Sequence, residues 1–160
     1  MARKNRFQIA HTRLTPKAVA FNDLESGGSW MDEFKPYGSE MIFERDHPSC
    51  YSSDAFAKMM QNSGSGESVL AGIGGSTSCL ATLIDAHCRA HRMRYIFDAS
   101  CSTAASMPHI VHSAASQLAE QFGDVLSTSI LFRILGEEAP DPMITGSMFC
   151  DGAASMDRYR

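Results

Sequence analysis

The sequence predicts a three-layer α/β/α domain built on a parallel, doubly wound sheet. Apolar runs of strand length alternate along the chain with segments whose apolar residues recur at helical spacing. The chain has 160 residues, of which 44% are apolar and 20% charged, an ordinary composition for one globular domain. Such alternation is typical of βαβ units, in which the strands run parallel and helices cover both faces of the sheet.

Five segments have the composition of strands. The run from Ser68 to Ile73 is continuously apolar, which is typical of a strand buried on both faces. The others combine β-branched, aromatic and aliphatic residues and end at polar residues or turns. The predicted strands are residues 7–12, 41–43, 68–73, 94–98 and 124–127.

Three segments have the periodicity of helices. Asp54 is the expected N-cap of the first, which places Phe56, Met59 and Met60 on one face. Gly123 suits the end of the last helix. We expect helices over residues 54–62, from 76–78 to 90, and over 108–122, and a loop with a short helix over 17–37.

Charge and apolar runs exclude several classes of partner. The net charge of −4 and the pI near 5.8 give no basic footprint for nucleic acid. No apolar run approaches the roughly 20 residues needed to cross a bilayer, and the N-terminus lacks the apolar core of a signal peptide. The five cysteines have no C-x-x-C spacing, which favours reduced thiols. We therefore expect a cytoplasmic protein that binds neither nucleic acid nor membranes.

The most informative segment, residues 69–86, contains a strand, a glycine turn, small polar residues and a helix. A turn of this kind surrounds its side chains with backbone N–H groups and the positive end of a helix. That environment stabilises a thiolate at Cys79 and can hold an oxyanion. We assign substrate binding here to Gly74, Gly75 and Thr77. Many turns between a strand and a helix look alike, so a purely structural turn is the alternative.

This segment resembles that of the isochorismatase-like cysteine hydrolases, which include nicotinamidases and other amidases. In that family a strand ends in Gly, five residues precede a nucleophilic Cys, and a Thr and an Asp-Ala pair follow on the helix. Gly72, Thr82, Asp85 and Ala86 match this pattern.

The resemblance extends over residues 3–128. The segment ERDHPSCY (residues 44–51) is similar to the family's segment with a catalytic Lys followed by Ser-Ala-Phe, and we assign substrate binding to its Tyr51. IFDA (residues 96–99) and residues 109–122 resemble the next strand and helix. The domain is expected to cover residues 1–135, and residues 136–160 to form a polar tail that is ordered only against a partner subunit.

The resemblance implies that an Asp, a Lys and a Cys cooperate, with the carboxylate taking the thiol proton. The strand that carries the Asp has no counterpart here. Arg45 takes the place of the Lys, and it keeps the charge but cannot shuttle a proton. Counting without gaps from Gly72 forward or from Thr82 backward places Ser78 at the nucleophile position and Cys79 one residue later.

Three interpretations of the site stay open. The site is catalytically silent, or Cys79 acts after a one-residue shift of the turn, or Ser78 acts as a poorer nucleophile that needs a strong base. The primary hypothesis is a hydrolase for an amide C–N or enol-ether type bond of a small molecule, weakened or inactive. Its rival is a non-catalytic relative that binds a ligand or serves as a subunit of an assembly. We expect a homo-oligomer.

The spacing of the histidine pairs does not predict a metal site. His87 and His91 are four residues apart, yet no carboxylate third ligand stands at a fitting spacing. His109 and His112 are three residues apart and are more typical of a helix surface. The family's Asp-x-His-x-His metal segment does not occur. We expect neither a metal nor an organic cofactor.

The resemblance also implies a sheet of order 3-2-1-4-5-6 that lacks its first strand. The strands at 7–12 and 68–73 would then flank the gap, and each buried unpaired backbone group would cost about 1 to 3 kcal/mol. We expect these strands to pair directly, to borrow a strand, or to belong to a shortened reading of a longer gene. The third option is preferred because residues 2–6 (ARKNR) read like the end of a helix. We also expect Arg45 to project into the same pocket as Ser78 and Cys79.

Overall fold

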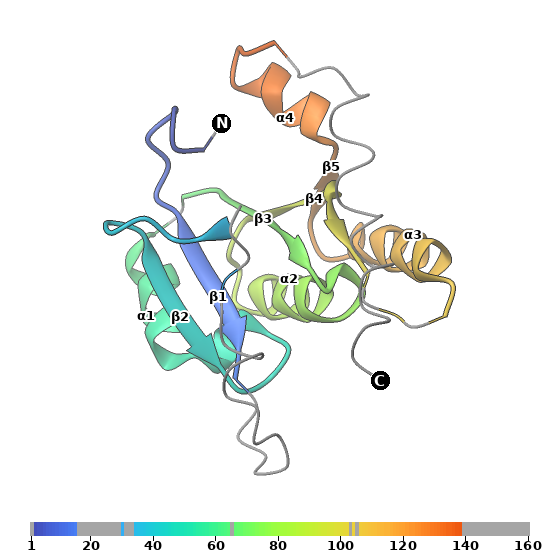
Figure 1. Cartoon of the computed structure of the whole chain (residues 1–160), viewed down its shortest axis with the longest axis horizontal. Helices are drawn as coiled ribbons and strands as arrows, with labels where there is room; N and C mark the ends of the chain where they lie inside the picture. The colour runs from blue at the N-terminus through green and yellow to red at the C-terminus, as the bar shows by residue number, and fades with distance from the viewer. Residues whose placement is uncertain are drawn as a thin grey trace. The chain divides into compact units, whose positions relative to one another are not determined.

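A computed structural model describes residues 2–15, 30, 34–64, 66–102, 104 and 106–138 of the chain. The chain divides into two compact units, Met1–Ser63 and Gly64–Arg160. Each unit contains its own parallel sheet and its own helices (Figure 1). The predicted α/β class with parallel strands is confirmed.

The first unit is a pair of parallel strands with one helix. β1 (Ala10–Leu14) pairs with β2 (Met41–Arg45), and a short 3-10 helix, η2 (Cys50–Ser52), leads into α1 (Asp54–Asn62). α1 has the predicted bounds, although its N-cap is Ser53 and not Asp54. Asp54 stands in the first turn, where its carboxylate interacts favourably with the helix dipole.

β1 lies further along the chain than predicted. Arg13 and Leu14 pair with β2, which extends the strand beyond residue 12. Phe7 is exposed, and its N–H donates to the carbonyl of Ala2 across a turn. Residues 2–6 form turns. The N–H of Arg6 also donates to the carbonyl of Arg3, and Arg6 has φ 55°, which together are the hydrogen bonds and the left-handed residue of a helix C-terminus. This local geometry agrees with the expected helix end.

The second unit carries a three-stranded sheet with strand order β3-β4-β5. In Figure 1, α2 and α3 lie on one side of these strands and α4 on the other, which gives three layers. The elements are β3 (Ser68–Ile73), the π-helical turn η3 (Gly75–Cys79), α2 (Leu80–Cys88), β4 (Met93–Cys101), α3 (Pro108–Ala119), β5 (Asp124–Leu126) and α4 (Thr128–Ile134).

The helix α4 is absent from the sequence-based expectations. Its N-cap Ser127 accepts a hydrogen bond from the N–H of Ile130. The carboxylate of Asp98, in the second half of β4, accepts from the N–H of Thr128 at 2.7 Å and from its hydroxyl at 2.8 Å. Ser127 was a local signal for this helix, whereas the cap from Asp98 depends on the tertiary fold.

The core of the second unit lies between β4 and its helices, with Leu83, Tyr95 and Ile96 at most 2% exposed. The prediction that β3 is buried on both faces is wrong, because Val69 and Ile73 are about half exposed. The physical reason is that the helices of this unit pack on β4 more than on β3.

The strands form two sheets where one was expected. Among the described strands, β1 pairs only with β2, and β3 pairs on one edge only, with β4. Direct pairing of the strands at 7–12 and 68–73, one of the three expected ways to close the sheet, would join the two units and stays a prediction. Within its own unit, each of β1 and β3 is paired along one edge only.

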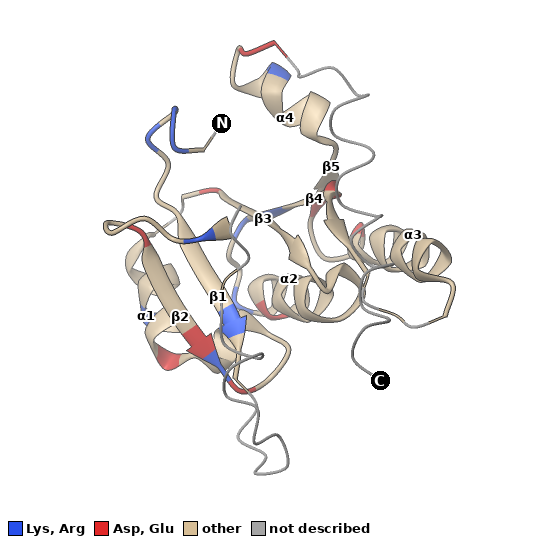
Figure 2. Ribbon diagram, in the orientation of Figure 1, with Lys and Arg blue, Asp and Glu red and all other residues tan. Residues whose placement is uncertain are grey.

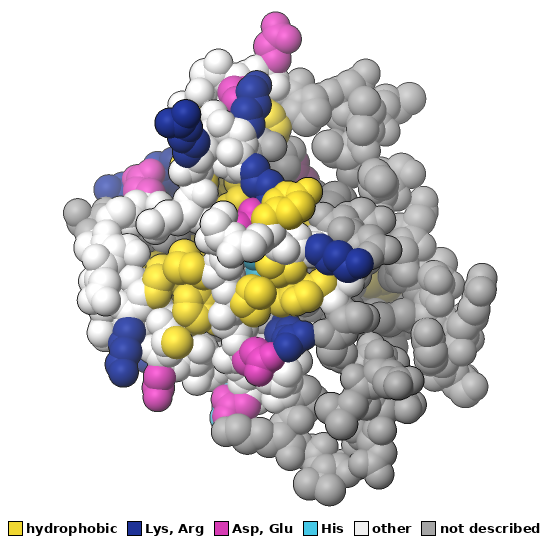
Figure 3. Space-filling view, turned by 60° about the vertical axis from the view of Figure 1, so that its left-hand side comes forward, with side chains coloured by type: hydrophobic (Ala, Val, Ile, Leu, Met, Phe, Trp, Pro, Cys, Tyr) yellow, Lys and Arg dark blue, Asp and Glu magenta, His cyan; other side chains and the backbone are white. Residues whose placement is uncertain are grey.

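The remaining expectations concern membrane-spanning helices, disulfides, and the loop and tail segments. In the described part of the chain no helix is long and apolar enough to cross a membrane. Large hydrophobic side chains reach the surface, as the space-filling view shows (Figure 3). The described cysteines, Cys50, Cys79, Cys88 and Cys101, form no disulfide. Cys150, residues 17–29 and 31–33 of the predicted loop, and residues 139–160 of the predicted tail lie outside the described residues.

Candidate functional site

The turn after β3, which we call the elbow (residues 74–79), begins at a glycine that the backbone requires. Gly74 has φ 86° and ψ 37°, a left-handed conformation that glycine adopts without steric cost. Its N–H donates to the carbonyl of Cys101 at 2.9 Å, which ties the end of β3 to the end of β4. The elbow therefore sits at the carboxyl end of the sheet, where α/β folds bind ligands.

The next residue, Gly75, is required by its neighbours. A Cβ at this position would lie 2.5 Å from the Tyr95 hydroxyl oxygen and 3.1 Å from His112 Nδ1. Both side chains belong to the core beneath the elbow. Glycine is thus required at the two positions for different reasons. At Gly74 the backbone angle requires it, and at Gly75 the close packing of neighbouring side chains requires it.

The elbow continues as a π-helical turn. The N–H groups of Thr77 and Cys79 both donate to the carbonyl of Gly74, at 3.0 and 3.2 Å, and the N–H of Leu80 donates to that of Gly75. Single π turns are rare and occur frequently at functional sites. The wide turn positions the side chains of residues 76–79 at the start of α2.

The two nucleophile candidates differ in exposure. Ser78 is half-buried, while Cys79 is 5% exposed and its Sγ lies 4.0 Å from the carbonyl oxygen of Gly72. Cys79 therefore lies on the inner side of the turn, and Ser78 reaches the surface. This arrangement agrees with the ungapped count, which places an apolar position at residue 79.

Hydroxyl groups surround the elbow. The Ser76 and Ser102 hydroxyl oxygens are 2.8 Å apart, and Ser102, 6% exposed, also accepts from the N–H of Ala104 at 3.1 Å. Thr77 is exposed, and its hydroxyl donates to the carbonyl of Gly74 at 3.4 Å. No Lys, Arg, Asp or Glu occurs in β3, the elbow or α3 (Figure 2).

Tyr95 and His112 are functional candidates that the sequence did not reveal. Tyr95 is 2% exposed, and burial raises its pKa to about 12. His112 Nε2 lies 2.9 Å from the carbonyl oxygen of Phe97. The Tyr95 hydroxyl is buried near the Ser100 and Ser116 hydroxyls, whose hydrogen bonding acts to lower its pKa. His112 Nδ1 is buried and has no hydrogen-bond partner among the described residues. The spacing of His109 and His112 did not show that only His112 points inward, and His109 is exposed.

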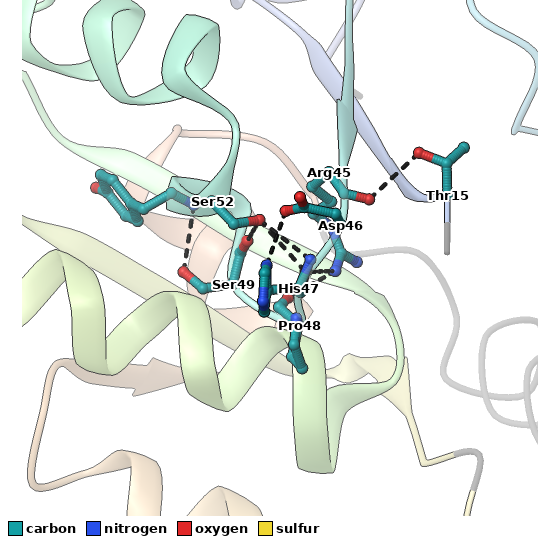
Figure 4. Close-up of polar contacts among 8 residues, drawn as sticks. Thr15, Arg45, Asp46, His47, Pro48, Ser49 and Ser52 are labelled. Carbon is teal, nitrogen blue, oxygen red and sulfur yellow. Dashed lines mark hydrogen bonds and ion pairs between the residues drawn. The ribbon is translucent and has the colours of Figure 1, made fainter. Parts of the chain in front are cut away.

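Arg45 holds a turn of the first unit. The residue is 8% exposed, and its Nη1 donates to the carbonyls of His47 at 2.9 Å and Pro48 at 2.6 Å (Figure 4). Its own carbonyl accepts from the N–H of Thr15 at 2.8 Å. These contacts give Arg45 a structural role in the segment between β2 and η2.

Tyr51 also belongs to the first unit and is 5% exposed. Its ring packs edge-on against Phe56, with the centroids 5.2 Å apart. The structure thus brings together Gly74, Gly75, Thr77, Ser78 and Cys79 in the second unit. Arg45 and Tyr51 lie in the first, on either side of the turn at 46–49.

The first unit contains an ion cluster that sequence analysis missed. The carboxylate of Glu40 accepts from Arg3 Nε at 2.7 Å, from the Tyr37 N–H at 2.9 Å and lies 2.8 Å from His11 Nε2. The Arg3 hydrogen bond, followed by that of the Tyr37 backbone, lowers the pKa of Glu40 to about 2. Arg3 also lies 3.9 Å from the centre of the Tyr37 ring.

The described residues offer no group of three His, Cys, Asp or Glu side chains placed to hold a metal. The ring of His87 packs edge-on against Phe122, with the centroids 5.8 Å apart, and therefore has a packing role.

Comparison with known proteins identifies the family to which the chain is similar. A family model described as the isochorismatase domain matches residues 1–130. No curated protein sequence matches the chain. Solved structures are similar in fold at low identity, so the likeness shows the fold alone.

Three of these structures illustrate the likeness. An isochorismatase-like hydrolase from Alkaliphilus metalliredigens is 16% identical, with a TM-score of 0.70 over 81% of this chain and 72% of that one. A cysteine hydrolase from Pseudomonas syringae pv. phaseolicola 1448A is 14% identical, with a TM-score of 0.70 over 84% and 75%. An N-carbamoylsarcosine amidase from Thermoplasma acidophilum is 17% identical, with a TM-score of 0.58 over 79% and 75%.

Proposed function

The chain belongs to the isochorismatase family, and from that premise we propose that it hydrolyses an amide C–N or enol-ether type bond of a small molecule at the elbow. The observation that carries this proposal is the half-buried Ser78 on a π-helical turn behind the left-handed Gly74. The turn opens a helix at the carboxyl end of a parallel strand, where N–H groups and the helix dipole favour a developing oxyanion.

Ser78 is the nucleophile in this proposal, and Cys79 is the alternative. Ser78 is half-buried, whereas Cys79 is 5% exposed and needs an opening of the turn to meet a substrate. A serine hydroxyl is hardly ionised near neutral pH and depends on a base. Gly74, Gly75 and Thr77 would hold the substrate through the elbow backbone and one exposed hydroxyl.

Weak catalysis is part of the proposal. The Arg45 guanidinium donates to two carbonyls of its own turn, which favours a structural role over a part in proton transfer. The elbow itself carries no carboxylate or amine. These two observations support the second candidate function, a non-catalytic relative that binds a small ligand or serves as an assembly subunit.

Two variants separate the candidates. Hydrolysis of a panel of primary amides, N-carbamoyl compounds and enol ethers should fall by about 100-fold or more in Ser78→Ala and little in Cys79→Ala, with binding measured by calorimetry. A loss in Cys79→Ala alone would transfer the nucleophile role. Binding by the native chain with no hydrolysis in any variant would contradict the hydrolase and support the ligand-binding candidate.

We further propose a cytoplasmic homo-oligomer with a domain over residues 1–135 and a tail over 136–160. The absence of disulfides among the four described cysteines supports a reducing compartment. The edge of β3 that is unpaired within its unit and the exposed Val69 and Ile73 support self-association. Sedimentation velocity of the full chain tests this, and a monomer at all concentrations would contradict it.

A further inference from the structure

The first unit contains a cavity at the amino end of its two strands, which we call the N-edge cavity. Its volume is about 430 Å³, within the range of sites that bind small molecules. Residues from two segments line it, 3–9 before β1 and 37–41 at the start of β2. The N–H of Met41 donates to the carbonyl of Ile9 at 3.0 Å and joins the two segments. The cavity shares no residue with the elbow, which belongs to the second unit.

Arg3 is a fixed cation in the lining of this cavity. Its Nε and Nη2 donate to the two carboxylate oxygens of Glu40 at 2.7 and 3.0 Å, and Nη2 also donates to the carbonyl of Lys35 at 3.2 Å. The Arg3 guanidinium carbon lies 3.9 Å from the centre of the Tyr37 ring. Among the described residues, Nη1 has no hydrogen-bond partner. Arg3 is therefore held in place by its neighbours and keeps the N–H groups of Nη1 for a ligand.

The carboxylate of Glu40 is satisfied within the first unit. Its side chain is 8% exposed, and besides Arg3 it accepts from the Tyr37 N–H at 2.9 Å and lies 2.8 Å from His11 Nε2. The ion pair with Arg3 neutralises its charge. The lining therefore has one arginine in excess of its carboxylate, in a chain whose net charge is −4. This local surplus of positive charge favours an anion.

Arg6 supplies the surplus charge. Its φ of 55° is left-handed, and glycine is the usual residue at such a position of a helix C-terminus. Backbone strain of this kind in a larger residue is concentrated at functional sites and ligand clamps. Arg6 is exposed, and its guanidinium makes no hydrogen bond or ion pair with a described residue. The strained position therefore presents an unpaired cation to the cavity.

Two aromatic side chains form part of the apolar lining. Phe7 and Tyr37 are 45% and 63% exposed, so a ligand in the cavity can contact both rings. Aromatic rings beside a guanidinium favour contact with flat apolar groups. A compact inorganic anion would leave both rings uncovered. The lining thus fits a ligand that has an anionic part and a flat apolar part.

We propose that the N-edge cavity binds a small organic anion in which an oxyanion group is carried on a flat apolar body. The Arg6 guanidinium pairs with the oxyanion in the planar, bidentate geometry that such groups favour, and Arg3 Nη1 adds a second charged donor. The apolar body packs against Phe7 and Tyr37. Binding changes no covalent bond.

This inference does not depend on the proposed function. The cavity lies at the amino end of parallel strands, whereas α/β folds place their reaction sites at the carboxyl ends. The ligand is therefore recognised and not hydrolysed at this position. Binding should also stabilise the first unit, because only the folded chain brings the segments 3–9 and 37–41 together.

The first experiment is a proton–nitrogen-15 NMR titration of the full chain with benzoate. We expect saturable shifts in the amide signals of residues 3–9 and 37–41. Benzamidine, which has the same ring and the opposite charge, should give no saturation. Inorganic phosphate, which has the charge but no ring, should bind at least about tenfold more weakly than benzoate.

Three results of this titration would overturn the proposal. One is the absence of saturable shifts in the two segments. The second is binding of benzamidine or phosphate as tightly as benzoate. The third is a set of benzoate shifts confined to residues 74–79, which would place the anion at the elbow and leave the hydrolase proposal standing.

The second experiment repeats the benzoate titration with variants. Arg6→Gln should weaken binding by about tenfold or more, because the ligand loses a charge-assisted pair. Phe7→Ala should weaken benzoate and leave phosphate unchanged. Arg92→Gln is the matched control, since it removes an exposed arginine of the second unit and changes the net charge equally. Arg6 and Phe7 are exposed, so both variants should keep the native spectrum. Equal benzoate affinity in Arg6→Gln and the native chain would overturn the proposal.

Discussion

The Tyr95 hydroxyl oxygen lies 2.5 Å from the position that a Cβ would take on Gly75, so the elbow and β4 interlock at a single atom. Real Cβ contacts are not this short. Tyr95 is 2% exposed, so its side chain is enclosed by the rest of the unit. The backbone path of the elbow is therefore set by packing from below as well as by the left-handed Gly74.

Gly75→Ala should destabilise the second unit by about 1 to 3 kcal/mol, because a methyl group forced into a packed core displaces its neighbours. Denaturant unfolding measures the loss. Tyr95→Phe removes the clashing oxygen and should recover part of the stability in the double variant. Gly38→Ala is the control, because nothing lies within 4 Å of its Cβ position. Equal effects at Gly75 and Gly38 would contradict the interlock.

The cap of α4 by Asp98 is a second contact between residues distant in the sequence, and its contribution to stability can be measured. Asp98→Ala removes the acceptor of the Thr128 N–H and hydroxyl, and should cost about 1 to 2 kcal/mol with early fraying of α4. Amide hydrogen exchange localises the fraying to residues 128–134. Asp98→Asn should retain part of the cap, and the exposed Glu120→Ala is the control. Unchanged exchange in α4 would contradict this role.

Local sequence patterns predicted helices and strands, but they did not predict the features that depend on tertiary contacts. The apolar run 68–73 and the helix 54–62 have their predicted bounds, because both depend on residues adjacent in sequence. Burial of β3 was overestimated, since a continuous apolar run does not reveal which faces the helices cover. α4 was missed because half of its cap comes from Asp98, distant in the chain.

The candidate site, like the fold, was predicted where it depends on local sequence and was missed where it depends on tertiary contacts. The glycine turn and the positions of Ser78 and Cys79 followed from spacing, and the structure places both residues on one turn. Tyr95 and His112 could not be found this way, because their meeting point at Gly75 depends on the β4 bulge and on the packing of α3. Arg45 was assigned by resemblance, and only its contacts reveal the turn that it holds.

The Glu40 cluster should make the first unit sensitive to acid. The folded-state pKa of Glu40 is lowered from 4.5 to about 2, so its contribution to stability is present above pH 4.5 and is lost as pH falls toward 2. Glu40→Gln should flatten the stability profile in that window. The more exposed Glu44, paired with Arg13, supplies the control variant Glu44→Gln. If both variants keep the native acid dependence, Glu40 does not act as described.

Arg45→Lys separates the structural role of this residue from a catalytic one. It introduces the residue that the family carries at this position, so a latent site would gain hydrolysis. The structure predicts the opposite outcome. A lysine ammonium lacks the planar fork of the guanidinium and reaches less far. The carbonyls of His47 and Pro48 therefore lose their charged donor.

We expect Arg45→Lys to lower the free energy of unfolding by about 1 to 3 kcal/mol without raising hydrolysis of any panel substrate. Thermal unfolding and the substrate panel measure the two effects on the same preparation. Arg13→Lys, at a more exposed arginine of the neighbouring strand, should change stability by less than about 1 kcal/mol. A stable Arg45→Lys variant with increased turnover would show that residue 45 belongs to the reaction, and the structural role argued from its carbonyl contacts would be wrong.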